Sequence, residues 1–256
     1  MKRIVQFVML TFLISWTLWL LQYLGQEEIL PSWFQIFGMF GLFGPFIVFM
    51  ILVKKDGLTY KEVFKKLFQK ASIKIILFAV LSPMIISAIS YIIYRNYAVG
   101  DIEPIGVTFA SFVPLALSIL FVGGPVEEFG WRGYLLPRLR GKYSFILTII
   151  IMGIIHGVWH IPLHFLDGTV QQALPIYEYL IVTLAITVSY VFIYEYTKSL
   201  IPMIILHWMA NLSSAIFPYF YNIEGRYALL ILTLVLDIIL IGIYYIKKRK
   251  NEKIIA

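Results

Sequence analysis

Long uncharged apolar stretches dominate this sequence and limit what it can fold into. Several run for about 20 residues, the length that an α-helix needs to cross the hydrocarbon core of a bilayer, which is about 30 Å thick. Hydrophobic residues make up 61% of the chain and charged residues only 14%, which is too apolar for a soluble domain. The sequence therefore predicts an all-α, polytopic membrane protein in which residues 1–256 form a single membrane domain.

Eight segments are predicted to span the membrane. They cover residues 4–24, 33–53, 73–94, 106–140, 144–162, 176–196, 199–216 and 227–246. The first could imitate a secretory signal peptide, but its apolar run is too long and no small-residue cleavage site follows, so we expect a retained span. The fourth is too long for one simple crossing and is interrupted at Gly123-Gly124-Pro125. Such breaks free backbone groups and are tolerated where a helix lines a cavity.

Basic residues gather in alternate loops. Most of the 21 lysines and arginines lie beside the two termini and after the second, fourth and sixth segments, whereas the intervening loops are acidic or mixed. By the positive-inside rule, both termini should be cytoplasmic. The net charge of +7 then reflects loops next to anionic lipid, so we expect no nucleic-acid partner. In residues 58–72 lysines alternate with apolar residues at helical spacing, which predicts an amphipathic helix in the interface.

Two adjacent carboxylates, Glu127 and Glu128, directly follow the break in the fourth segment. An ionisable residue at membrane depth costs about 3 kcal/mol and usually marks a functional site. Glu128 and Arg132 have the i,i+4 spacing of an ion pair. Glu127 points away from Arg132 by roughly 140°, which leaves it available as a general acid or base. The alternative is that the three residues only stabilise a helix end.

All four histidines lie in two later apolar segments. His156 and His160 are i,i+4 neighbours on one helix face. The short Gly141-Lys142 connection folds this segment antiparallel to the acidic helix, and counting the helical rise from it places Glu127 and His156 at similar depth. We therefore expect the carboxylate to meet an imidazole. His164, beyond a proline, is expected to have a structural role.

His207 and Asn211 form a second i,i+4 pair on an apolar helix. Both side chains can donate hydrogen bonds, as an oxyanion site requires, although polar pairs of this kind also serve helix packing. Counted from Lys198, His207 lies shallower than Glu127. The absence of cysteine excludes disulfides, thiolate catalysis and cysteine-containing zinc sites.

Three motifs give residues 107–215 a resemblance to the catalytic core of the CPBP family (CAAX protease and bacteriocin-processing, also called Abi). These intramembrane glutamic endopeptidases include the Rce1-type CAAX prenyl endopeptidases. The motif Glu-Glu-x-x-x-Arg corresponds to 127–132, Phe-x-x-x-His to 156–160 and His-x-x-x-Asn to 207–211. His156 stands where the family has phenylalanine, so the division of roles between His156 and His160 stays open.

The resemblance implies an activity. Glu127, together with His160, would activate a water molecule that attacks a peptide carbonyl. His207 and Asn211 would stabilise the tetrahedral oxyanion. No metal or cofactor is implied. Substrates could be leader peptides, bacteriocin precursors or membrane proteins, and a prenylated CAAX substrate does not follow.

The remaining site residues receive supporting roles from the same resemblance. Glu128 and Arg132 would hold the first carboxylate in place, and His156 and Trp131 would line the cavity. The expected location is a bacterial cytoplasmic membrane, with the lipid bilayer and a peptide or membrane-protein substrate as partners.

Three other functions fit these residues. His156, His160 and His207 with Glu127 would give the nitrogen and oxygen ligands that zinc accepts, although no His-Glu-x-x-His motif is present. Alternatively, the chain could be a non-catalytic binding or bacteriocin-immunity protein that keeps the scaffold without turnover. A transporter that relays protons is the third possibility, and the absence of a visible internal repeat counts against it.

Overall fold

The computed structural model describes residues 1–97, 107–122 and 124–255, and this part of the chain contains helices and no strand. The all-α prediction is therefore confirmed, while Gly123 of the predicted break lies outside the described residues. The α-helices are α1 (Lys2–Gln26), α2 (Phe37–Gly41), α3 (Gly44–Lys55), α4 (Tyr60–Leu67), α5 (Ile73–Tyr97), α6 (Phe109–Val122), α7 (Glu128–Gly130), α8 (Leu136–Arg140), α9 (Phe145–Trp159), α10 (Ile176–Thr197), α11 (Ile201–Ile216) and α12 (Ile223–Ile255). Five short 3-10 helices and one π-helix complete the structure: η1 (Ser32–Ile36), η2 (Gly124–Glu127), η3, the π-helix (Trp131–Leu135), η4 (Ile161–Phe165), η5 (Gln171–Ala173) and η6 (Tyr219–Tyr221).

Six helical segments among the described residues are long and apolar enough to cross a membrane. They are Lys2–Gln26, Ile73–Tyr97, Ala110–Arg140, Phe145–Phe165, Ile176–Thr197 and Ile223–Lys250. The pair Ser32–Gly41 and Gly44–Lys55, bent by 54°, makes a seventh if it counts as one span. The predicted span 199–216 corresponds to α11, whose 16 residues rise only about 24 Å. The structure thus reduces eight predicted spans to six or seven.

The outer helices present apolar side chains outward and bury polar ones. In α1, Val5, Met9 and Leu13 are exposed, whereas Thr11 and Ser15 are fully buried. The Ser15 hydroxyl donates a 2.7 Å hydrogen bond to the Gly41 carbonyl of α2. Exposed apolar surface of this extent on a long helix is suited to lipid rather than water. The apolar helices indicate a multi-pass membrane protein.

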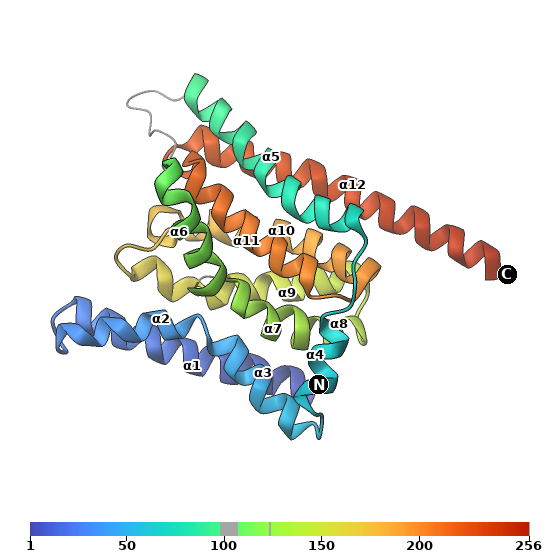
Figure 1. The fold of residues 1–256 in the computed structure, drawn as a ribbon, viewed down its shortest axis with the longest axis horizontal. Coiled ribbons are helices and arrows are strands. Elements are labelled where there is room, and N and C mark those ends of the chain that lie inside the picture. Colours follow the sequence, from blue (N-terminus) through green and yellow to red (C-terminus); the bar gives the residue numbers. More distant parts are fainter. Residues whose placement is uncertain (98–106, 123, 256) are drawn as a thin grey trace.

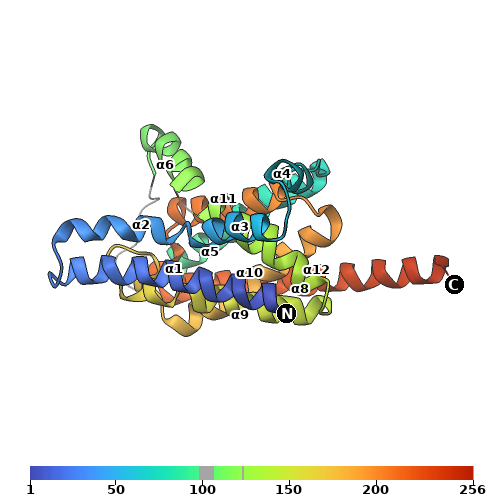
Figure 2. The same ribbon diagram turned by 90° about the horizontal axis from the view of Figure 1, so that it is seen from below.

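The helices form layers around a polar interior. Helices α1–α3 lie on one side and the pair α5 and α12 on the other, with α7 to α11 between them (Figure 1). Seen from below, α1 runs alongside α2 and α3, and α12 extends beyond the other helices (Figure 2). Trp16 of α1 donates a 3.0 Å hydrogen bond to the Trp159 carbonyl at the end of α9. This contact joins the first layer to the central one.

The predicted amphipathic helix forms over a shorter range than 58–72. Helix α4 begins with a capping box in which Thr59 and Glu62 each bond the other's backbone. Its Phe64 ring packs against Phe129 of α7, with ring centroids 5.6 Å apart. The Leu67 carbonyl accepts a 2.7 Å hydrogen bond from the backbone N–H of Leu200, just before α11. Helix α4 therefore contacts both the acidic segment and the helix that carries His207.

Candidate active site

The acidic segment is helical, as predicted, but its geometry changes along its length. Gly124–Glu127 forms a 3-10 turn, Glu128–Gly130 a short α-turn and Trp131–Leu135 a π-turn, before α8 resumes. Turns of the π type are rare in proteins overall, but those that occur are frequently found at functional sites. Both carboxylates lie at the junction of the 3-10 and α-turns.

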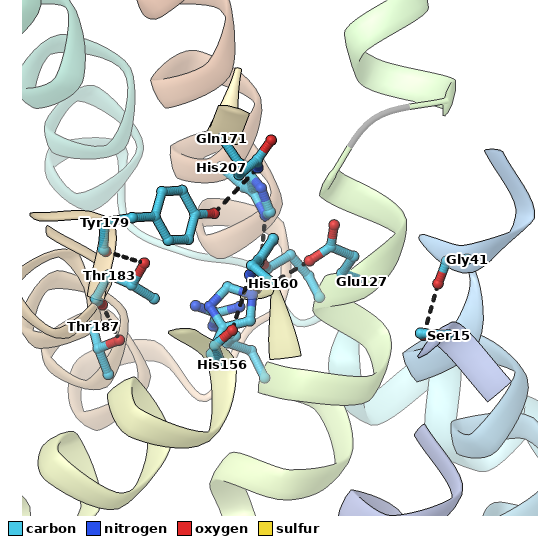
Figure 3. A network of polar contacts seen from close by, with 12 residues as sticks. Ser15, Gly41, Glu127, His156, His160, Gln171, Tyr179, Thr183, Thr187 and His207 are labelled. Atoms are coloured by element: carbon cyan, nitrogen blue, oxygen red, sulfur yellow. Dashed lines mark hydrogen bonds and ion pairs between the residues drawn. The ribbon is translucent and has the colours of Figure 1, made fainter. Parts of the chain in front are cut away.

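Glu127 meets two imidazoles, as the antiparallel hairpin predicts. Its Oε2 lies 3.3 Å from His156 Nε2. One donor atom from each of Glu127, His156 and His160 lies within 4.8 Å of the others, and all three side chains are buried. Figure 3 shows Glu127 turned toward the two rings. We call these three residues the Glu127 cluster.

A backbone hydrogen bond fixes the tautomer of His160. Its Nδ1 lies 2.9 Å from the His156 carbonyl oxygen, which can only accept, so Nδ1 carries the proton. Nε2 of His160 is therefore an unprotonated acceptor in the neutral ring. Such a nitrogen can orient a water molecule or bind a metal ion.

Glu128 forms a separate ionic cluster with side chains of two helices. Its Oε1 accepts a 3.0 Å hydrogen bond from Arg132 Nη1, and both side chains are fully buried. The same oxygen lies 2.5 Å from His207 Nδ1. The Arg132 guanidinium also stacks on the Tyr190 ring, 3.8 Å from its centroid. The predicted i,i+4 ion pair is present, and His207 adds a partner that the sequence did not indicate.

The two clusters border one cavity of about 590 Å³. Its lining includes Glu127, His156, His160, His207 and Asn211, so it unites residues of all three motifs. His207 faces Glu128, and Asn211 lies one helical turn further along α11. A mostly apolar cavity with a few convergent polar groups is typical of a ligand site.

Trp131 lies behind the cavity rather than along it. Its side chain is fully buried and packs edge-on against His156, with ring centroids 5.2 Å apart. His164 anchors a loop, because its Nδ1 lies 3.1 Å from the Leu174 carbonyl oxygen. This contact agrees with the structural role expected for His164.

A glycine allows α11 to approach the acidic segment closely. A Cβ atom added at Gly124 would overlap the imidazole of His207. The close approach brings His207 within reach of Glu128, which lies on another helix. The Gly-Gly-Pro sequence indicated a helix break but not this contact.

Several cavity residues were missed by the sequence analysis. The Tyr179 ring lies 5.3 Å from that of His160, and Tyr190 holds Arg132. Tyrosines inside an apolar helix give no recognisable signal. Glu178 pairs with Arg226 at 2.6 Å on the cavity lining. Here a signal was available, because Glu178 is an acidic residue at the start of an apolar segment.

Comparison with known proteins confirms the resemblance. Residues 109–213 match the family described as type II CAAX prenyl endopeptidase Rce1-like, a range that includes all three motifs. The chain is also 27% identical over 220 residues to CAAX prenyl protease 2 of Methanococcus maripaludis, covering 79% of this chain and 80% of that protein. Both matches support an Rce1-type family for this chain. The similarity to this family supports intramembrane endopeptidase activity and agrees with the multi-pass architecture.

Proposed function

We propose that this protein is an intramembrane glutamic endopeptidase whose base is Glu127. The observation that carries the proposal is the Glu127 cluster, a buried carboxylate beside two imidazoles on the wall of a cavity. Glu127 and His160 Nε2 together can hold one water molecule. Glu127 would accept its proton, and His160 Nε2 would orient it by accepting a hydrogen bond. No serine or cysteine nucleophile is needed.

The proposed reaction has two proton transfers. Glu127 takes a proton from water as the water oxygen attacks the peptide carbonyl carbon, which gives a tetrahedral oxyanion. Hydrogen bonds from Asn211, and from His207 if it turns from Glu128, would stabilise that charge. The carbon–nitrogen bond then breaks, and Glu127 returns the proton to the leaving amine. The chemistry needs no cofactor.

The ion pair of Glu128 and Arg132 would act by positioning. The ion pair would fix the backbone turn that also carries Glu127. The negative charge of Glu128 and the positive charge of Arg132 compensate each other inside the protein. Glu128 is therefore a poor candidate for the base, since its Oε1 is already engaged by Arg132 and His207.

The substrate class proposed is a peptide or a membrane-protein segment that enters from the bilayer. The name of the Methanococcus maripaludis relative refers to prenylated CAAX proteins, and this chain need not share that preference. We place both termini and α4 on the cytoplasmic side of a bacterial cytoplasmic membrane, because the basic segments lie on one face in the charge pattern.

One assay tests the proposal and its competitors. Purified protein in detergent is given a fluorogenic peptide, with and without a chelator. We expect Glu127→Gln to lower turnover at least 10²-fold, because an amide cannot accept the proton, while exposed Glu62→Gln serves as the matched control. Turnover that survives chelation supports the glutamic mechanism. Loss on chelation would favour a zinc hydrolase, and no turnover of any reporter would favour a binding or immunity protein.

A further inference from the structure

The Glu127 cluster is also a set of metal ligands. Two imidazoles and one carboxylate are the protein ligands of a common class of catalytic zinc site, which leaves a fourth position open. Their donor atoms lie within 4.8 Å of one another. Within the described residues, no other group of three or more His, Asp or Glu side chains comes together in this way. His207, which the sequence added to a possible zinc set, is held by Glu128 instead.

The spacing of the donors fits an ion after a small adjustment. Tetrahedral zinc with bonds of about 2.0–2.2 Å separates its ligands by about 3.3–3.6 Å. His156 Nε2 and Glu127 Oε2 are already 3.3 Å apart. The third donor lies within 4.8 Å, so side-chain rotations that move it by about 1.5 Å or less complete the set.

The two imidazoles differ in how well they are prepared for a metal. His160 Nδ1 donates to a backbone carbonyl, which leaves Nε2 free and holds the ring as second-shell partners do in zinc proteins. His156 Nδ1 is buried without a hydrogen-bond partner. When His156 Nε2 binds a metal, the ring proton must occupy that unsupported Nδ1 or leave. The affinity of this site for a metal ion should therefore be lower than that of a structural zinc site.

We propose that Glu127, His156 and His160 bind a divalent transition-metal ion such as Zn²⁺, and that the bound ion inhibits the protease. A metal-bound Glu127 cannot take the proton from water. Zinc peptidases use a further carboxylate as base, and the neighbouring Glu128 is engaged by Arg132 and His207. The binding site stands on geometry alone, whereas the inhibition rests on the proposed function.

The binding is tested without any activity measurement. Chelator-treated wild-type protein in detergent is titrated with ZnCl₂ by calorimetry, and bound zinc is counted by mass spectrometry. We expect about one ion per chain, and an affinity at least tenfold weaker for His156→Phe and His160→Gln. His164→Gln is the matched control, since His164 is outside the cluster. Zinc should raise the melting temperature of wild type but not of His156→Phe. Absent binding, or equal affinity in His156→Phe, overturns the site.

The inhibition is tested on the same preparations. Metal-free wild type should cleave the reporter peptide, and saturating Zn²⁺ should lower its turnover at least tenfold. His156→Phe should need at least tenfold more zinc for half-inhibition of its own turnover. Turnover that is lost on chelation and restored by zinc would make the ion a cofactor and overturn the inhibition. Zinc binding without turnover in either form would reject the proposed function and leave the metal site intact.

Discussion

The two carboxylates are adjacent in the chain but face different partners. Glu128 is bound at one oxygen by Arg132 and His207, so its charge is compensated inside the protein. Glu127 has its 3.3 Å contact with the neutral or charged imidazole of His156 and faces the cavity. This difference is the reason that the proposed mechanism assigns proton exchange with water to Glu127 and a positioning role to Glu128.

The two histidines of the Glu127 cluster should differ in importance. His160 presents an unprotonated Nε2 that can orient water, whereas His156 contacts Glu127 and occupies the position of the motif phenylalanine. We expect His160→Ala to be nearly inactive and His156→Phe to turn over the reporter peptide at least tenfold faster than His160→Ala. Steady-state kinetics of metal-free protein check this order. The reverse order would assign water activation to His156.

Asn211 is the cavity residue best placed to act as an oxyanion donor, because its side chain forms no hydrogen bond with the described residues. Asn211→Ala should lower kcat by roughly 10²–10³-fold with little change in KM. Asn96→Ala, an exposed asparagine of α5, is the control. A change confined to KM would instead make Asn211 a substrate-binding residue.

At the scale of elements, the contact between η2 and α11 depends on the missing side chain of Gly124. Gly124→Ala should push α11 away, because the new Cβ would overlap His207. Overpacking of this kind costs about 1–3 kcal/mol, and the contact between His207 and Glu128 should be lost with it. Thermal melting and turnover should both fall. Gly141→Ala is the control, since its Cβ would meet no atom closer than 3.5 Å. Equal behaviour of the two variants would contradict the close approach.

What the sequence predicted well is what depends on local spacing. The apolar segments, the Glu128–Arg132 pair and the meeting of Glu127 with His156 follow from helical periodicity and one short hairpin. The contact between His207 and Glu128 joins residues 79 positions apart. Counting the helical rise from Lys198 placed His207 at a shallower membrane depth than the glutamates and so did not predict this contact. The count includes neither the tilt of α11 nor the 3-10 and π-turns of the acidic segment. Packing between helices decides these features.

At the scale of the whole molecule, Asp56 joins three segments that are distant in the sequence. Its carboxylate pairs with Arg3 of α1 and Arg138 of α8, each at 2.6 Å, and accepts a 2.9 Å hydrogen bond from Tyr134. The start of α1, the end of α3 and the end of the acidic segment are thereby fixed to one another. The three basic segments therefore lie close together in the fold.

This cluster should make stability depend on pH through Asp56. Burial alone would raise the pKa of Asp56, but hydrogen bonds from Tyr134 and Arg138 and the positive charges of Arg138 and Arg3 outweigh it and hold the pKa below its ordinary value of 3.8. A lowered pKa contributes stability above the unfolded pKa that is lost as pH falls through the folded one.

Asp56→Asn removes this contribution. Its melting temperature in detergent should lie below that of wild type at pH 7, and the gap should narrow as pH falls below about 4, where the wild-type carboxylate begins to protonate. Exposed Glu27→Gln, whose side chain has no ion pair among the described residues, should show little gap at any pH. A gap for Asp56→Asn that stayed constant down to pH 3 would mean that the Asp56 charge does not hold the three segments together.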